Sequence, residues 1–353
     1  MTLAADDQAV FPNSEEAVFA EQPDGTIGPV EASPEPQPVT PQAIAVQLRK
    51  DMSAVRLHRG KWGISKKLDR DQTDRAALAF NADGKALSAS KKIVNSKDDC
   101  LRKVNGTLAE AVHYWKSVTI PYPEDGVRLI RRERIDKFNE TMTGLRQQLR
   151  AEAQELEAKY QELVEEAKGR LGELYNENDY PASVKALYRL EWDFPSVEPP
   201  PHLLEVAPQV YAQEMARIQA RFELAVSLTE DAFADQFAKL LEKLTRQLSF
   251  GEPEMDPATG QMVRKPKAFY ESSIEGLQEF FDRFKALNVG GSEELEALIA
   301  EAKAVVGTTD AKTIRKDVAT RGAIEHGLAD VANKLNQMMQ VRPIRQMNLL
   351  DEE

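Results

Sequence analysis

The chain has 353 residues and a formal net charge of −12, with 29% charged and 42% hydrophobic residues. Its one cysteine, Cys100, excludes a disulfide within the chain and favours a reducing compartment. The sequence has no apolar run of about 18 residues and no basic-then-apolar leader. We therefore expect a soluble, cytoplasmic protein rather than a membrane or secreted one.

The charges are distributed unevenly along the chain. Residues 1–48 contain eight Asp or Glu and no Lys or Arg. Residues 49–150 contain 23 Lys or Arg against 13 Asp or Glu, a net +10, and the remaining 203 residues carry −14. The basic block indicates a nucleic-acid or acidic partner, although the solvated faces of charged helices produce the same pattern.

Residues 1–42 combine seven prolines with acidic and small residues. They offer too little apolar surface to offset the entropy of ordering, so we expect a disordered, acidic, Pro-rich arm. Such an arm either competes for the basic block or docks on a partner, or it is a solvated leader without a binding role.

Residues 43–126 form a basic region of helices and loops. Residues 43–48 can open a short helix, but the mixed spacing of residues 52–68 does not separate strand from helix. Within it, Trp62 stands between basic pairs and could stack a nucleic-acid base, or it could anchor the loop in a core. A helix is predicted from Ser96 to Ser117, because a capping pattern precedes one apolar face. An extended Pro-Tyr-Pro segment follows at residues 121–123.

A long helix is predicted over about residues 127–176, where apolar residues recur at spacings of three and four. A second one is predicted over residues 209–248, after a Pro-rich extended connector at 191–201. Two helices of similar length joined by a compact connector favour an antiparallel hairpin over residues 127–248. The seam of the first helix consists of Ile135, Met142, Leu149, Leu156 and Leu163.

The rest of the chain is predicted to be a β-hairpin or loop at 249–268, helices at 269–342 and a tail at 343–353. The C-terminal helices are expected at 274–287, from Ser292 onward, and at 310–341. The fold class is therefore mainly all-α: an elongated antiparallel helical hairpin or coiled coil with flanking helices and a small β-hairpin. Less than about a tenth of the chain is expected in strands.

No motif predicts catalysis, a cofactor or a metal site. The four histidines are scattered, and none pairs with another or with Cys100 at metal-ligand spacing. No glycine pattern of a phosphate-binding loop occurs. We therefore expect a protein that is not an enzyme.

The order of several segments resembles an uncharacterised family of helical proteins carried by phages and integrative mobile elements. These segments are residues 62–68 (WGISKKL), the Pro-Tyr-Pro exit, the long charged helix and residues 188–195 (YRLEWDFP). The resemblance covers roughly residues 50–250 and is to a domain of unknown function. It implies a mobile-element context in a bacterial host, near an ATPase-type partner, and supplies no catalytic residues.

Two functions from different classes follow. The first is a non-enzymatic scaffold or adaptor that binds a protein partner, and itself, through the helical hairpin. The alternative is a nucleic-acid-binding protein of replication, recombination or packaging that uses the basic region 49–150. The candidate contacts with an anion, a nucleic acid or another partner are Arg59, Lys61, Trp62, Lys66, Lys67, Arg128, Arg131, Arg132 and Arg134.

Overall fold

The computed structural model describes residues 19–21, 27–29, 41–255, 262–307, 309 and 311–341. The chain divides into two compact units, Met1–Val39 and Thr40–Glu353. In the first unit, β1 (Phe19–Glu21) and β2 (Ile27–Pro29) pair as antiparallel strands. The rest of the arm predicted to be disordered lies outside the described residues, apart from residues 41 and 42, which begin α1. The tail at 343–353 also lies outside them.

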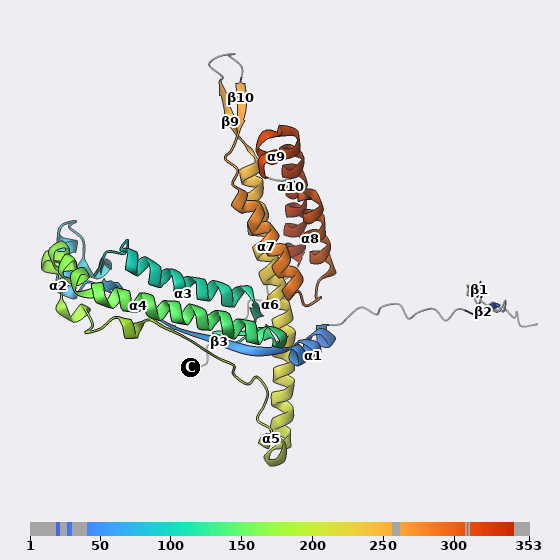
Figure 1. The fold of residues 1–353 in the computed structure, drawn as a ribbon, viewed down its shortest axis with the longest axis horizontal. Helices are drawn as coiled ribbons and strands as arrows, with labels where there is room; N and C mark the ends of the chain where they lie inside the picture. The colour runs from blue at the N-terminus through green and yellow to red at the C-terminus, as the bar shows by residue number, and fades with distance from the viewer. Residues whose placement is uncertain are drawn as a thin grey trace, which may run out of the picture. The chain divides into compact units, whose positions relative to one another are not determined.

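The second unit is mostly helical, which confirms the main part of the predicted fold class (Figure 1). Two apolar clusters form its core. One gathers α3 and α4, and the other gathers α1, α6, α7, α8, α9 and α10. The helices of eight residues or more are α1 (Pro41–Asp51), α2 (Arg70–Leu78), α3 (Asp99–Ser117), α4 (Ile135–Leu171), α6 (Pro208–Leu248), α7 (Glu271–Leu287), α8 (Glu293–Val306) and α10 (Val318–Val341).

The predicted seam is the buried face of α4. Met142, Leu149, Leu156 and Leu163 are buried, and Ile135 packs partly buried against the same cluster. The helix ends at Gly172, whose φ of 53° is a left-handed conformation that glycine adopts without strain. The predicted start at residue 127 is wrong. Residues 127–131 form β7 (Val127–Arg131), and a 3-10 turn, η2 (Arg132–Arg134), leads into α4.

Helix α3 packs antiparallel along α4, as their side-chain contacts show (Figure 1). Near its start, Asp98 receives Lys159 of α4 at 2.8 Å, and farther along, Thr107 donates to Glu152 at 2.7 Å. The predicted helix from Ser96 to Ser117 is confirmed, with Asp98 as the N-cap residue rather than Ser96. The Asp98 carboxylate accepts the backbone N–H groups of residues 100 and 101, which leaves fewer unpaired donors at the helix start.

We expect Asp98→Ala to lower the free energy of unfolding by about 1–2 kcal/mol at neutral pH. Burial raises the pKa of Asp98, but the hydrogen bond from Lys159 and those from the backbone N–H groups outweigh it and leave the pKa below its usual value. The stabilisation is therefore present above the unfolded pKa, about 3.9, and is lost as the pH falls through the folded value. Asp98→Asn keeps the helix cap but removes the charge. The difference in free energy of unfolding between Asp98→Asn and the unmodified chain, measured by urea unfolding, should therefore shrink as the pH is lowered. A difference that stays constant from pH 7 to about pH 3 would contradict this assignment.

A four-stranded antiparallel sheet separates the two clusters. Its order is β6 (Thr119–Pro121), β7, β3 (Met52–Gly60) and β8 (Arg189–Asp193). Alternate residues of β3 face opposite sides: Met52 and Ala54 belong to the cluster of α1 and α6, whereas Val55 belongs to that of α3 and α4. In β7, Leu129 and Ile130 alternate in the same way. The sheet therefore holds the two helical clusters together.

The sheet corrects two expectations. Strands make up more than a tenth of the chain, because β3 pairs with segments that lie about 70 and 130 residues later along the sequence. The connector expected at residues 191–201 begins inside the sheet, because residues 191–193 belong to β8, which follows a 3-10 turn, η5 (Lys185–Leu187). Residues 52–68, where the sequence did not separate strand from helix, contain β3 and β4 (Ser65–Lys67). Strand β4 pairs with β5 (Ser90–Lys92) in a small two-stranded sheet.

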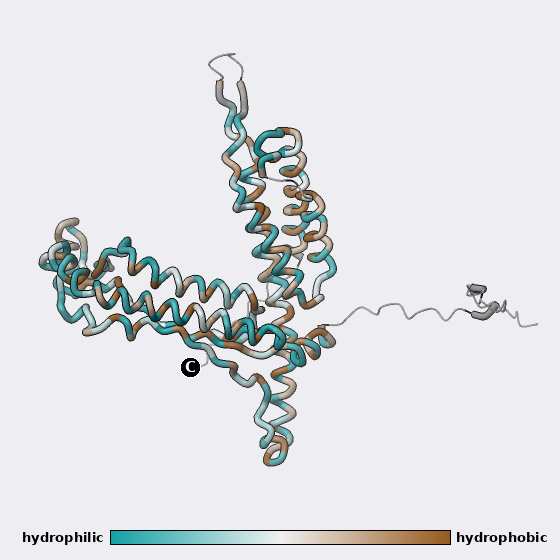
Figure 2. The backbone as a smooth tube through the Cα atoms, in the orientation of Figure 1, coloured by the Kyte–Doolittle hydropathy of each residue, from teal (hydrophilic) through white to brown (hydrophobic). Residues whose placement is uncertain are grey.

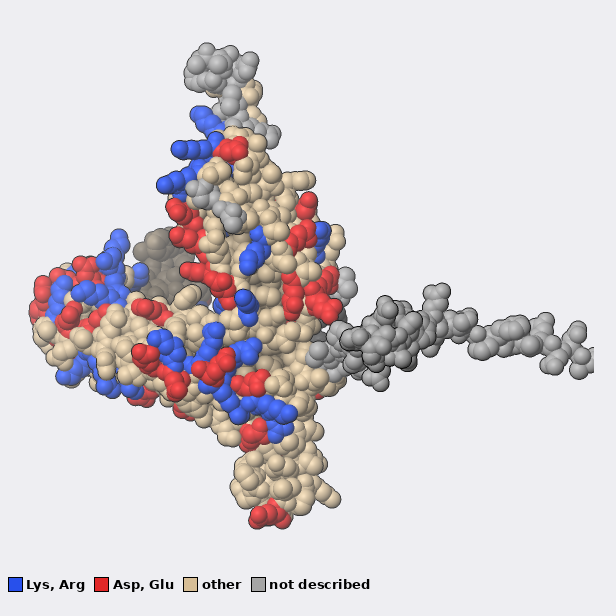
Figure 3. All heavy atoms as spheres, turned by 45° about the vertical axis from the view of Figure 1, so that its right-hand side comes forward, with Lys and Arg blue, Asp and Glu red and all other residues tan. Residues whose placement is uncertain are grey.

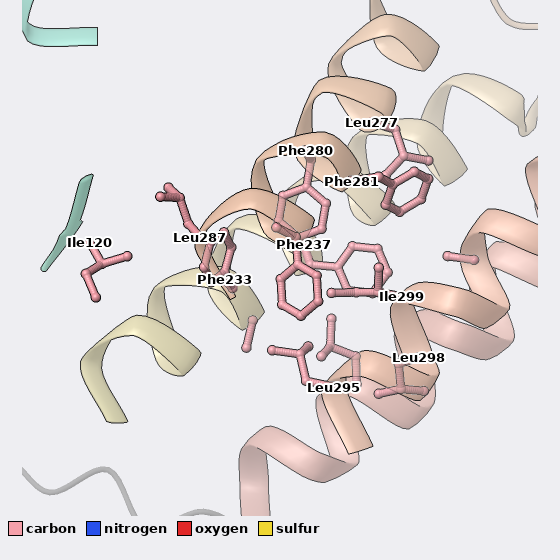
Figure 4. Packing of buried hydrophobic residues seen from close by; sticks show 14 of the residues in the cluster. Ile120, Phe233, Phe237, Leu277, Phe280, Phe281, Leu287, Leu295, Leu298 and Ile299 are labelled. Carbon is pink, nitrogen blue, oxygen red and sulfur yellow. The ribbon is translucent and has the colours of Figure 1, made fainter. Parts of the chain in front are cut away.

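Helix α6 confirms the second long helix, but it does not form the predicted hairpin with α4. All buried residues of α4 that join a cluster pack with α3 and the sheet, whereas those of α6 pack with α1, α7 and α10. Each apolar face is therefore already covered by another partner. Figure 4 shows Phe233 and Phe237 of α6 meeting Phe280 and Phe281 of α7. Phe237 and Phe280 are stacked, with ring centroids 5.3 Å apart.

The predicted β-hairpin is confirmed as β9 (Phe250–Met255) paired with β10 (Met262–Pro266), and its turn lies outside the described residues. The helices expected at 274–287 and from Ser292 onward are confirmed as α7 and α8, with Ser292 as the N-cap of α8. The single helix expected at 310–341 is two helices, α9 (Ala311–Lys316) and α10. Asp317 lies between them and accepts the backbone N–H of Ala319.

Candidate nucleic-acid interface

Trp62 is a core residue. Only 5% of its surface is exposed, and its ring meets Tyr160 of α4 edge to face, with centroids 5.5 Å apart. Its neighbours Arg59 and Lys61 are exposed. The structure therefore places Trp62 where a nucleic-acid base cannot stack on it, which corrects that reading of residues 59–68 and leaves the alternative, an anchor for the loop.

The four candidate arginines near residue 130 lie in two neighbouring elements, β7 and η2. Arg128 lies in β7, donates to the side chain and the carbonyl of Thr119, and sits 5.6 Å above the Trp115 ring. Burial lowers its pKa to about 10, and the nearby charge of Arg283 acts in the same direction. Backbone and side-chain acceptors of the chain itself occupy this guanidinium.

Arg131 is also used within the fold. It donates to the carbonyls of Ala286 and Asn288, where a cation is favourable at the C-terminal end of α7. Arg132 is exposed and donates weakly to the carbonyl of Met52, at 3.4 Å. Arg134 is half-buried immediately before α4 and makes no cap hydrogen bond to that helix. The group therefore divides into Arg128 and Arg131, which bind groups of the chain, and Arg132 and Arg134, which are more accessible.

The exposed lysines that remain form what we call the lysine ribbon, namely Lys66 and Lys67 of β4 with Lys92 of β5. The register pairs Ser65 with Lys92 and Lys67 with Ser90, so Lys67 and Lys92 are diagonal neighbours on one face. Lys66 pairs with Lys91 and therefore lies on the other face of the ribbon. All three side chains are exposed, and none has a carboxylate within 4 Å among the described residues. Three cations without internal partners are available to an external anion.

The ribbon is fixed to the C-terminal end of α4. Lys91, between the exposed lysines, is buried and reaches Asp179 at 2.8 Å and the carbonyl of Leu174 at 2.6 Å. Arg170 donates to the carbonyl of Lys92. Figure 3 shows acidic side chains mixed with basic ones at this end of the unit. In the connection between β4 and β5, two acidic residues are used internally: Asp69 caps α2, and Asp83 caps η1 (Gly84–Ala86).

The residue that sequence reasoning missed is Phe80. It follows α2 in the connection between the two ribbon strands, and 80% of its surface is exposed. Leu78 in the same turn is 72% exposed. Nothing in the residue type distinguishes Phe80 from a core aromatic. A weak signal was present, because Asn81 follows it in a left-handed conformation (φ 52°) that suits a turn residue.

A second surface stands out for its lack of charge. It comprises α5 (His202–Val206) and the first turns of α6, and we call it the apolar tip. Leu204, Val206 and Val210 are 55%, 79% and 45% exposed. Between residues 199 and 216 the only charged side chains are Glu205 and Glu214. Figure 2 colours α5 as hydrophobic, and Figure 3 shows the same end almost free of Lys, Arg, Asp and Glu.

Within the part of the chain that the structure describes, no helix has the length and apolar character to cross a membrane. In the same residues, no three His, Cys, Asp or Glu side chains gather where they could hold a metal ion. Comparison with known proteins finds no matching family model, no matching curated protein and no matching solved structure.

Proposed function

We propose that the protein binds nucleic acid through the lysine ribbon. The observation that supports this proposal is the set of three exposed lysines on β4 and β5 that have no carboxylate partner among the described residues. The connection between these two strands also carries an exposed aromatic residue, Phe80. Lysines neutralise backbone phosphates without reading sequence, and Phe80 offers a face on which a base can stack. The phage or mobile-element context remains part of this proposal, supported by the residue pattern of the sequence.

The residues predicted for the basic site differ in how accessible they are to a nucleic acid. Trp62 and Arg128 are occupied inside the fold, whereas Arg59, Lys61 and the ribbon are exposed. The acidic arm carries eight carboxylates and no cation in residues 1–48. Such an arm would compete with phosphates for the ribbon, so a chain lacking residues 1–39 should bind more tightly.

The test is the combined variant Lys66→Ala, Lys67→Ala and Lys92→Ala. We expect fluorescence anisotropy with a labelled single-stranded oligonucleotide at about 50 mM salt to show weaker binding. The slope of log affinity against log salt should fall by about two units, close to 0.7 per lost contact for a single strand. The effect follows from the counterions that three fewer lysines would release.

The matched control removes the same charge elsewhere, through Lys243→Ala, Lys303→Ala and Lys312→Ala. These lysines are exposed on α6, α8 and α9. The control should bind like the unmodified chain. An equal loss in both triple variants would show that only net charge matters. No binding by the chain without residues 1–39 would remove this function altogether.

The second candidate is a non-enzymatic scaffold, and the apolar tip favours it. The predicted hairpin seam cannot serve this role, because it is buried within the chain. The apolar tip is exposed, and its lack of charge resembles the apolar interfaces of homodimers. We propose that the apolar tip binds a second copy of the chain.

We expect size-exclusion chromatography with light scattering to give the mass of a dimer and Val206→Asp to give that of a monomer. A charge placed in an apolar interface loses its hydration, which disfavours association. Val318→Asp, at a position that is 60% exposed on α10, is the control and should remain dimeric. A monomer for the unmodified chain at all concentrations would rule this candidate out.

A further inference from the structure

Among the described residues, no helix covers one half of a sheet face. The side of β3 that carries Met52 and Ala54 is covered by α1 and α6, but farther along the same side His58 is exposed. The strand β8 continues this face with Glu191 and Arg189, because the register places His58 opposite Glu191 and Gly60 opposite Arg189. This uncovered half is polar, whereas the covered half is apolar.

The uncovered half contains a hollow of about 500 Å³. Its lining consists of Leu57, His58, Arg59, Arg189 and Glu191. His58, Glu191 and Arg189 share the face described above, and Leu57 and Arg59 complete the wall from the neighbouring positions of β3. Leu57 is the one apolar residue of this lining, so the hollow suits a polar or charged ligand.

The polar groups of this region fall into an occupied and an available set. Asp193 is occupied, because it accepts Arg56 at 2.8 Å and His58 at 3.1 Å. Arg56 and His58 thus have a carboxylate partner. Arg189 and Glu191 are exposed and have no ion-pair partner within 4 Å among the described residues. Arg59, which also lines the hollow, is exposed and has no ion-pair partner in the same residues. Two guanidinium groups and one carboxylate of the lining therefore lack an ion-pair partner within the described part of the chain.

Gly60 of β3 lies close to the side chain of Arg189 and to the backbone of Leu187. A Cβ atom at Gly60 would stand 3.3 Å from Nε of Arg189 and 2.6 Å from the carbonyl oxygen of Leu187. The contact with the Leu187 carbonyl would be a clash, so glycine at this position lets the backbone before β8 approach β3 closely. The side chain of Arg189 passes the same position.

The charges select the class of ligand. Among the lining residues without an ion-pair partner in the described part of the chain, Arg59 and Arg189 outnumber Glu191, so an anionic ligand is favoured. The planar guanidinium matches the oxygens of a phosphate through two parallel hydrogen bonds. Glu191 would repel a bare phosphate but would accept a hydrogen bond from a hydroxyl or amino group on the same molecule.

We infer that this hollow binds the phosphate of a nucleotide, with Arg189 holding the phosphate and Glu191 accepting a hydrogen bond from the sugar or base. The nucleotide can be free or part of a nucleic-acid strand, and only the second source rests on the proposed function. In the second case the strand would pass from the hollow over Lys61 toward the ribbon, since six residues of extended chain from Lys61 to Lys66 span at most about 20 Å.

Calorimetric titration with 5′-AMP and with inorganic phosphate tests the free source. We expect Arg189→Ala to weaken 5′-AMP binding about 10- to 100-fold, as the loss of a charge-assisted contact requires. Glu191→Gln should weaken 5′-AMP but strengthen inorganic phosphate, because it removes a repelling charge. These opposite signs would not arise from a general loss of structure. Equal changes for both ligands would overturn the assigned role of Glu191.

Anisotropy with the oligonucleotide tests the strand source, with Arg150→Ala as control. Arg150 is an exposed arginine of α4 with no ion-pair partner in the described residues. Arg189→Ala should weaken oligonucleotide binding about tenfold and Arg150→Ala should not. If the unmodified chain binds no oligonucleotide, the proposed function fails and the 5′-AMP titration alone decides the hollow. No 5′-AMP binding at about 10 mM, together with no effect of Arg189→Ala on the oligonucleotide, would overturn the inference.

Discussion

Arg321→Ala is expected to lower the free energy of unfolding by about 3–5 kcal/mol, because the substitution removes a buried side chain and leaves one buried and two partly buried carbonyls without this donor. Arg321 is only 3% exposed and lies on α10. Its guanidinium donates to the carbonyls of Leu248 at 2.7 Å, Gln247 at 2.6 Å and Lys267 at 2.7 Å. These acceptors lie at the end of α6 and just after β10.

The position of Arg321 explains why the cost is high. The last carbonyls of a helix have no partner within the helix, and at the end of α6 this arginine satisfies two of them. The guanidinium also lies 5.9 Å from the centroid of the Phe250 ring. Burial lowers its pKa, against the opposing charge of Glu325. A single side chain thus joins α6, the β9–β10 hairpin and α10.

Urea unfolding of Arg321→Ala beside Arg315→Ala measures this effect. Arg315 makes the same type of contact, to the carbonyl of Phe269 at 3.1 Å, but it is exposed. Water can replace it there, so we expect a loss of about 1 kcal/mol or less. Arg321→Lys should lie between the two, because one ammonium cannot reach all three carbonyls. Similar losses for the two alanine variants would contradict a special role for Arg321.

The helices could be predicted where one apolar face recurs over many turns. The stripe of α6 and the seam of α4 are examples, and their buried residues follow the 3.6-residue period. Residues 127–131 could not be separated from α4 in this way. Val127, Leu129 and Ile130 lead directly into the apolar spacing of the helix, and only the pairing of Leu129 with Ala54 shows that they form a strand.

The sheet as a whole is fixed by distant pairings that no local pattern contains. Residues 52–56 of β3 pair with β7, and residues 56–60 pair with β8 on the other side. The absence of long-range information in local sequence patterns also explains why the predicted hairpin of the two long helices was wrong. Each long helix has an apolar face, but the sequence does not say which other element covers it. In the structure, α3 covers that of α4, and α1, α7 and α10 cover that of α6.

The sequence predicted exposed charged residues of the candidate interface, but it did not predict which aromatic residue is exposed. Lys66 and Lys67 are exposed as expected, because charged side chains retain their hydration at the surface. The neighbouring residues in the sequence suggest an exposed Trp62 and a buried Phe80, and the structure shows the opposite. A tryptophan between basic residues looks available, yet it fills the core, while a phenylalanine after an Ala-rich helix is exposed. Exposure is a property of the tertiary structure, so residue type alone cannot assign it.

Trp62→Ala is therefore expected to reduce stability by about 3–5 kcal/mol, since it removes a large buried ring and leaves a cavity beside Tyr160. The folded fraction should still bind single-stranded oligonucleotide like the unmodified chain. Phe80→Ala should do the reverse. Its ring is 80% exposed, so stability should change by no more than about 0.5 kcal/mol. Single-strand affinity should fall by about 1–3 kcal/mol, the usual value of a stacked base.

Thermal unfolding and anisotropy on the same two variants separate the two roles, and each variant is the control for the other. A base stacked on Phe80 must be unpaired, so Phe80→Ala should leave duplex binding nearly unchanged. If Trp62→Ala instead weakens single-strand binding at unchanged stability, the loop opens in solution and Trp62 is the stacking residue. If Phe80→Ala changes neither stability nor binding, the lysines act alone through phosphate contacts, and single strands and duplexes should then differ only in the salt dependence of their binding.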